Sequence, residues 1–198
     1  MGTGEEVKIG LEHLLPGWSF TTVDAIGRSG GLATGWNSQK VQVLNTWGLD
    51  SGLGITFLLP ELNEKVHLLN IYEPYLNGKP FWDTLLKKSF FKDLLILGGY
   101  INLSLGPSEV WGNSARPDPL ADFFNNKFVE TYLSDLAPSP LKPTWKNKRI
   151  GTDGVEKKLD HFLIYDTLLN YSPTIKQWIG FGGLSDHHPI FLELRQDS

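Results

Sequence analysis

A short polar motif near the C-terminus carries residue types suited to phosphate chemistry. It reads Ser185-Asp186-His187-His188-Pro189 and stands directly before an apolar segment at 190–194. A carboxylate at such a position can orient a metal ion or a water molecule, and the adjacent imidazole can stabilise charge on a phosphate oxygen or transfer a proton. The alternative is a polar turn that begins a strand, which is the more common role of an Asp-His pair on a loop.

Three further residues stand at the ends of apolar segments. Asp160 precedes the segment 162–164, where a buried carboxylate could fix one tautomer of an imidazole. Asn102 follows two glycines after the segment 94–97, and Tyr72 ends another apolar segment. Active sites of layered α/β folds often lie at such strand ends. Taken singly, each residue has a plainer explanation as a strand cap, a surface charge or a packed side chain.

Hydropathy predicts the short strands that would position these residues. Apolar and polar residues alternate over 18–23, as in a half-buried strand. Gly- and Asn-rich breaks separate the segments that follow in the first part of the chain. The other expected strands cover 32–36, 41–47, 55–59, 66–72, 94–97, 162–164 and 190–194.

Two helices are expected among these strands. Pro80 suits the first turn of one, in which Phe81, Leu85 and Phe90 recur at roughly helical spacing. Strands first, then helices alternating with strands, predict a mixed α/β sandwich whose helices cover the sheets. The second helix is expected over 118–133, with its inward residues being Phe123, Phe124, Phe128 and Leu133.

Composition limits the classes of protein. The chain has 198 residues, of which 40% are hydrophobic, which suits one domain with a packed core. Absence of cysteine excludes disulfides, zinc-thiolate sites and cysteine nucleophiles. The net charge of -4 argues against a large electrostatic footprint on nucleic acid, but acidic metal ligands would also lower this total. The polar N-terminus is no secretion signal and no apolar run could span a bilayer, so we expect an intracellular protein.

The order of the motifs resembles the endonuclease/exonuclease/phosphatase superfamily, and especially the endonuclease domains of plant LINE-type retrotransposons. The resemblance runs from about Trp18 to the C-terminus, so we expect a single domain over 1–198, a two-sheet α/β sandwich that lacks the family's first strand. The series is more specific than any one motif. The matching segments are 27–32, 72–74, 98–103, 110–112, 118–124, 143–147, 157–160 and 185–189.

The resemblance implies hydrolysis of phosphodiesters with Mg²⁺, or Mn²⁺ in its place, without a covalent enzyme intermediate. His187 matches the histidine that contacts the scissile phosphate, and Asp160 matches the aspartate that pairs with it. Asp186 matches the acidic residue near the metal. Asn102 matches the asparagine that holds the phosphate or the attacking water, and Tyr72 the tyrosine near the phosphate.

Two departures from the family pattern bear on activity. The family has Gly-Gly-Asp-x-Asn where this chain has Tyr100 in place of the aspartate that aligns the water. A phenol has a pKa of roughly 10, and the loss of general-base help predicts a rate loss of about 10² to 10⁴. At the N-terminus, Glu5-Glu6-Val7-Lys8 is either the remnant of the family's metal-binding motif, with Glu6 as the ligand, or a frayed acidic end.

Three residues are candidate nucleic-acid contacts. Trp145 and Arg149 lie in a stretch that faces nucleic acid in relatives, where Trp145 could stack on a base or pack in the core. Arg28 could meet a phosphate or cap a strand edge. His161 and Tyr165 stand where the family usually has Arg and Ser, which is expected to alter the phosphate-facing rim more than the fold.

Three functions remain open at this point. The first is a Mg²⁺-dependent DNA-nicking endonuclease of retrotransposon origin, monomeric and impaired by Tyr100, whose intact relatives carry a reverse transcriptase domain. The second is a catalytically dead or vestigial domain that binds nucleic acid weakly, which would show no Mg²⁺-stimulated turnover. The third acts on inositol or sphingolipid head groups, and ranks last because segments 118–120 and 143–145 are LINE-like.

Overall fold

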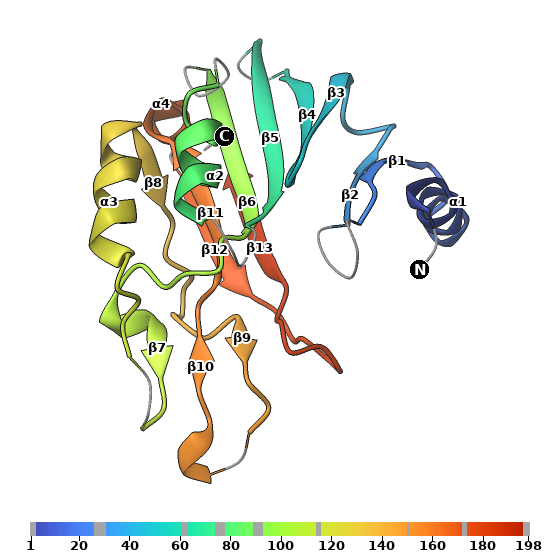
Figure 1. Ribbon diagram of the computed structural model, residues 1–198. Coiled ribbons are helices and arrows are strands. Elements are labelled where there is room, and N and C mark those ends of the chain that lie inside the picture. The colour runs from blue at the N-terminus through green and yellow to red at the C-terminus, as the bar shows by residue number, and fades with distance from the viewer. Residues whose placement is uncertain are drawn as a thin grey trace. The chain divides into compact units, whose positions relative to one another are not determined.

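The computed structural model describes most of the chain and divides it into two compact units. The first unit comprises residues 1–99 and the second residues 100–198, both drawn in Figure 1. Arg28 and Phe90 lie outside the described residues, so their predicted roles stay predictions. The described residues are 3–25, 31–60, 63–73, 78–88, 93–113, 116–149, 151–171 and 174–195.

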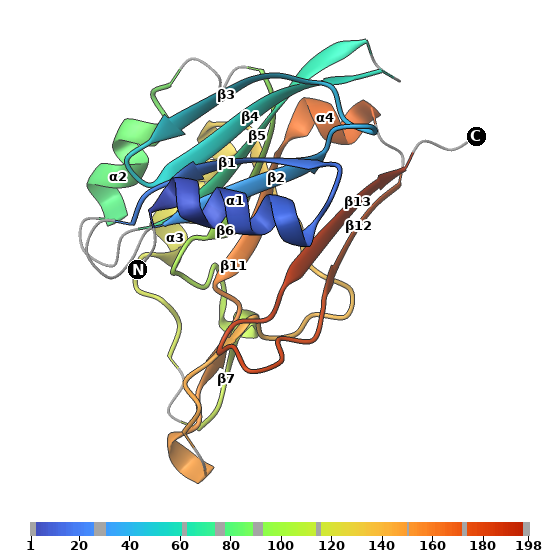
Figure 2. The same ribbon diagram turned by 90° about the vertical axis from the view of Figure 1, so that its right-hand side faces the viewer.

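The first unit begins with a helix and continues mainly in strands. Helix α1 (Gly4–Leu14) packs on β1 (Trp18–Val23), which pairs in antiparallel fashion with β2 (Leu32–Asn37), as Figure 2 shows. Helix α2 (Gly78–Leu85) precedes the last strand of the unit. The remaining strands are neighbours in one sheet in chain order: β3 (Val43–Leu49), β4 (Gly52–Leu59), β5 (Glu64–Tyr72) and β6 (Leu94–Tyr100).

The backbone near the end of β6 requires a glycine at position 99. Gly99 has a φ of 133°, a backbone conformation that side chains rarely adopt. A Cβ atom at this position would lie 2.2 Å from the backbone oxygen of Ile71 in β5. Only glycine therefore fits beside Ile71, and the backbone it permits leads directly into Tyr100 at the start of the second unit.

The second unit contains three groups of paired strands. β8 (Leu133–Asp135) pairs with β11 (Asp160–Tyr165), and β12 (Thr174–Ile179) with β13 (Ile190–Arg195). An arm projects from the rest of this unit in both Figure 1 and Figure 2, and consists of β7 (Val110–Trp111), β10 (Glu156–Lys157) and β9 (Trp145–Lys146). The helical elements are η2 (Pro107–Glu109), α3 (Ala121–Glu130), η3 (Gly151–Asp153) and α4 (Asp166–Tyr171).

The mixed α/β class and the eight expected strands are confirmed, and several details are corrected. β6 continues through both glycines to Tyr100, whereas the sequence analysis ended it at the glycines. Leu133 is buried as predicted, but in strand β8 and not in the preceding helix, which ends at Glu130. The pattern missed α1, α4, β12 and the short strands of the arm. No helix of the described residues is long and apolar enough to cross a membrane.

The buried leucine at the centre of β11 provides a test of the core. Leu163 is fully buried, whereas Leu184 is fully exposed. Leu163→Ala should lower the free energy of unfolding by about 2–5 kcal/mol, because it removes packed methyl groups and leaves a cavity. The same change at Leu184 should stay within about 0.5 kcal/mol. Urea denaturation of both variants measures the difference, and equal effects would contradict this placement of the core.

Candidate active site

A hydrogen bond between Asp160 and His187 forms the centre of the site. Asp160 begins β11 and His187 lies in the loop before β13, and its Nδ1 is 2.8 Å from the Asp160 Oδ2. The side chains are 15% and 34% exposed, respectively. The hydrogen bond from Asp160 raises the pKa of His187, against a smaller lowering by desolvation, and the charges of Asp160 and Asp186 raise it further. The imidazolium form is therefore favoured.

Tyr100 and Asn102 lie beside this pair. The Tyr100 hydroxyl donates to Oδ1 of Asn102, and the Tyr100 ring meets the His187 ring edge-on, with 5.1 Å between centroids. Asn102 has a φ of 54°, in the left-handed region that asparagine tolerates better than most residues. Because its Oδ1 accepts from the phenol, the amide NH₂ of Asn102 is directed elsewhere. The structure thus brings together Asp160, His187, Asn102 and the substituted Tyr100.

Thr144 holds the two segments that carry the pair, and the sequence analysis did not single it out. Its buried Oγ1 accepts hydrogen bonds from the backbone N–H groups of Leu159 and Asp160, at 2.9 and 3.0 Å. Its carbonyl oxygen accepts from the backbone N–H of His188 at 2.7 Å, and its own N–H donates to Lys157. One residue therefore ties Asp160 to the loop that carries His187.

A second charged cluster lies immediately before Asp160. Lys158 is fully buried, and its ammonium group is 2.9 Å from Glu109 Oε1, 2.8 Å from Asp135 Oδ2 and 2.7 Å from His161 Nδ1. Burial alone would raise the pKa of Asp135, but the charges and hydrogen bonds of His161 and Lys158 outweigh burial and lower it. The cluster is therefore a charge-compensated network in the interior.

This cluster has the composition of a metal site but already holds a cation. Glu109, Asp135 and His161 offer ligand atoms that all lie within 4.8 Å of one another. The ammonium of Lys158 contacts all three, so a metal ion and this group exclude each other. We therefore do not assign a metal ion to this position.

The placement of His161 corrects one expectation. His161 is fully buried, with Nε2 3.1 Å from the carbonyl oxygen of Leu103 and Nδ1 2.9 Å from Asp135. It therefore belongs to the interior network and not to a phosphate-facing rim. Tyr165, the other departure near Asp160, is half-buried and packs edge-on against the ring of Tyr132.

The predicted metal-site residues lie in different units. In the second unit, Asp186 is half-buried, and its carboxylate is close enough to raise the pKa of His187. In the first unit, Glu6 lies on exposed helix α1 and not at the end of a strand. Its carboxylate accepts from the backbone N–H of Thr3 at 2.8 Å and completes a capping box. Tyr72, also in the first unit, is the half-buried last residue of β5. The roles predicted for Glu6 and Tyr72 stay predictions.

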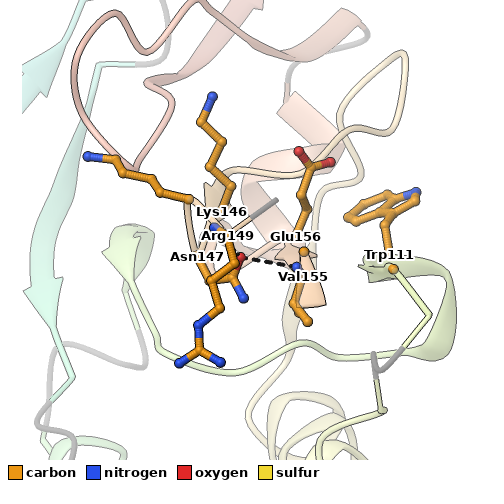
Figure 3. Close-up of a pocket in the computed structure, with 9 residues that line it drawn as sticks. Trp111, Lys146, Asn147, Arg149, Val155 and Glu156 are labelled. Carbon is orange, nitrogen blue, oxygen red and sulfur yellow. Dashed lines mark hydrogen bonds between the residues drawn. The ribbon is translucent and has the colours of Figure 1, made fainter. Parts of the chain in front are cut away.

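The arm carries the remaining candidate nucleic-acid contacts. A hollow of about 200 Å³ on the arm is lined in part by Trp111, Lys146, Arg149 and Glu156. Figure 3 shows Lys146 and Glu156 extending in the same direction, with Trp111 beyond Glu156. Arg149 is exposed, and Trp145 is half-buried in β9, where its backbone forms a bridge with that of His187. Trp145 thereby connects the arm to the loop of the candidate pair.

The raised pKa of His187 leads to a measurable titration. Its imidazole should titrate above the ordinary histidine pKa in an NMR pH series, and Asp160→Asn should lower that pKa, because an amide oxygen lacks the negative charge that stabilises the imidazolium. The pair should stabilise the fold fully below the unfolded-state pKa of about 6.5 and lose this effect as pH rises through the raised value. Unchanged titration in Asp160→Asn would contradict the assigned contact.

Comparisons with solved structures show which fold the chain has. No protein-family model matches the chain, and no curated protein matches it. Among solved structures, the chain is similar to the endonuclease domain of TRAS1, a telomere-specific non-LTR retrotransposon, with a TM-score of 0.69 and 17% identity, covering 94% of this chain and 84% of that one. An AP endonuclease from Archaeoglobus fulgidus gives a TM-score of 0.68 and 15% identity, covering 94% and 82%.

A third similar structure carries the name of a superfamily. It is an endonuclease/exonuclease/phosphatase family protein from Bacteroides thetaiotaomicron, with a TM-score of 0.57 and 14% identity, covering 93% of this chain and 78% of that one. At such identities the likeness concerns the fold, and the fold agrees with the class expected from the order of the motifs. The chain has the α/β fold of the endonuclease/exonuclease/phosphatase superfamily.

Proposed function

We propose that the chain carries a Mg²⁺-dependent phosphodiester hydrolase site of the DNA-nicking kind, of LINE retrotransposon origin and impaired by Tyr100. The main support is the 2.8 Å contact between Asp160 Oδ2 and His187 Nδ1, with Asn102 and Tyr100 beside it. The proposal includes a monomeric intracellular protein, whose intact relatives carry a reverse transcriptase. The endonucleases among the similar structures support a nucleic-acid substrate.

His187 supplies positive charge and a proton at the phosphate. Asp160 accepts the hydrogen bond from Nδ1, so Nε2 is the ring nitrogen that can reach a substrate. The raised pKa of His187 keeps the ring protonated over a wider pH range. An imidazolium at this position stabilises negative charge that develops on a phosphate oxygen and can protonate the leaving oxygen.

Asn102 orients the phosphate, and Tyr100 limits the reaction. With its Oδ1 held by the Tyr100 hydroxyl, Asn102 can donate its NH₂ hydrogens to phosphate oxygens. The same contact occupies the asparagine oxygen that could otherwise accept from the attacking water. The Tyr100 phenol provides no carboxylate to align that water, so attack is expected to be slow.

The donors present suit Mg²⁺ rather than a softer metal. Mg²⁺ usually binds through one or two carboxylates, with waters and substrate phosphate oxygens as its other ligands. Asp186 would supply a carboxylate beside His187, and Glu6 is the second carboxylate that we propose. When bound, the metal would neutralise charge on the phosphate. Tyr72 is proposed to contact the same phosphate.

The arm is proposed to contact DNA outside the scissile bond. The stretch 142–149 contains four basic residues and no acidic one, although the whole chain has a net charge of -4. Exposed Arg149 and neighbouring Lys146 suit phosphate contacts, and half-buried Trp145 suits stacking on a base. Arg28 is proposed as a further phosphate contact.

A second candidate function has an observation in its favour. The Tyr100 hydroxyl is already hydrogen-bonded to Asn102, and its ring packs against His187, so the phenol is integrated into the site. Such an arrangement also fits a catalytically dead domain that binds nucleic acid weakly. Mg²⁺-stimulated turnover separates this alternative from the hydrolase.

Nicking of supercoiled plasmid tests the role of His187. His187→Ala should lower the Mg²⁺-dependent nicking rate by at least about 10²-fold, because the charge and proton donor at the phosphate are lost. The matched control is His13→Ala, at an exposed histidine on α1, which should nick like the original chain. Equal rates for the two variants would show that His187 takes no part in the reaction.

Restoring the carboxylate at position 100 tests the cause of impairment. Tyr100→Asp should raise the nicking rate by about 10²- to 10⁴-fold, the usual contribution of a positioned general base. Tyr100→Phe removes the hydrogen bond to Asn102 without adding a carboxylate, and should stay within a few-fold of the original rate. If Tyr100→Asp and Tyr100→Phe gain equally, relief of the Asn102 contact is the cause. If neither nicks, the dead domain is the better assignment.

A further inference from the structure

The buried ammonium of Lys158 contacts three side chains from three separate elements. Glu109 ends η2, Asp135 ends β8 and His161 lies in β11. Two of its N–H groups donate to the carboxylate oxygens of Glu109 and Asp135, at 2.9 and 2.8 Å, and the ammonium also lies 2.7 Å from His161 Nδ1. A buried lysine held between two carboxylates is restrained in position, because displacing its ammonium group would leave buried charges unpaired.

Lys158 lies two residues before the candidate catalytic aspartate, Asp160. Lys158 and His161 flank Leu159 and Asp160 in the chain, and both side chains join the buried network. The backbone N–H of Lys158 also donates to the carbonyl oxygen of Glu109 at 2.9 Å. The network therefore restrains the chain on both sides of Asp160. The carboxylate of Asp160 must stay within hydrogen-bond reach of His187, and a shift of about 1 Å would be enough to lose that contact.

The three partners of Lys158 would suit a divalent cation if the ammonium were absent. Two carboxylates and an imidazole, with ligand atoms all within 4.8 Å of one another, are ligand types that zinc binds. In the native chain the ammonium stands where such an ion would bind. The cluster therefore behaves as a cation site that is filled by a side chain of the protein itself.

We propose that Lys158 is a positioning residue that acts as the internal cation of the Glu109–Asp135–His161 site and so holds Asp160 against His187. The proposal deepens the proposed function, because the pair it positions is the one assigned to phosphodiester hydrolysis. It is nevertheless tested without turnover, so a failure of the nicking assays would leave it standing.

The test removes the ammonium and offers a metal in its place. Lys158→Ala should lower the Tm by at least about 6 °C, as expected when a buried charged pair loses one partner. It should also weaken the downfield proton resonance of His187 Nδ1, which reports the hydrogen bond to Asp160. Added Zn²⁺ should raise the Tm of this variant and restore the resonance. In the original chain Zn²⁺ should raise the Tm less than in the variant, because the ammonium already occupies this cluster.

Two further variants complete the test. Lys127→Ala is the matched control, because Lys127 forms a comparable 2.8 Å pair with Glu130 at the surface, and it should leave both the Tm and the His187 resonance nearly unchanged. If Lys158→Ala does not fold, Lys158→Met with Glu109→Gln removes the cation together with one carboxylate. This double variant should have a weakened His187 resonance that Zn²⁺ does not restore. An intact His187 resonance in either Lys158 variant would overturn the proposal, as would a Tm of Lys158→Ala that Zn²⁺ leaves unchanged.

Discussion

The candidate site depends on how firmly the four residues 157–160 are held. Thr144 accepts hydrogen bonds from the backbone N–H groups of Leu159 and Asp160, and donates its own to the carbonyl of Lys157. The carbonyl of Leu159 accepts from Ile101, next to Asn102. Because backbone groups are fixed at both ends of this short segment, the Asp160 carboxylate has little freedom. A flexible surface aspartate could not maintain a 2.8 Å contact with His187 as reliably.

Two groups of charged side chains in the second unit differ in burial: the Lys158 network and the Asp160–His187 pair. Lys158 and its partners are almost wholly buried, so their electrostatic interactions are strong and any missing partner is costly. The Asp160–His187 pair is partly exposed, so it can exchange protons with solvent. The interior group provides rigidity, and the exposed pair provides a titratable charge. Proximity of acidic and histidine side chains alone would not distinguish the two, whereas the ammonium at the centre of one group does.

The sequence indicated Asp160 and His187, which the structure brings into contact, but it did not indicate the residues that hold them in place. Asp160 and His187 stand in ordered motifs at strand boundaries, and a carboxylate beside a histidine is chemically recognisable. Thr144 is an ordinary hydroxyl residue in a loop, and its importance lies in backbone contacts that only the folded chain reveals. Lys158 looks like a surface charge until burial is known. The expected strands were similarly predictable from hydropathy. Helix α1 was missed because its Thr3–Glu6 capping box was not recognised in an acidic terminus.

Tyr100 changes the electrostatics of the site as well as its chemistry. An aspartate at this position would join Asp160 and Asp186 near His187, and three carboxylates in one place repel one another unless a cation lies between them. The phenol removes one of these charges. Its hydroxyl donates a hydrogen bond to Asn102, and its ring packs edge-on against His187, so the hydroxyl is not left without a partner. With tyrosine at this position, the proposed site should depend less on a metal ion for its stability and should bind one less tightly. If the chain has the proposed hydrolase site, Tyr100 therefore affects both the alignment of the water and the affinity for the metal.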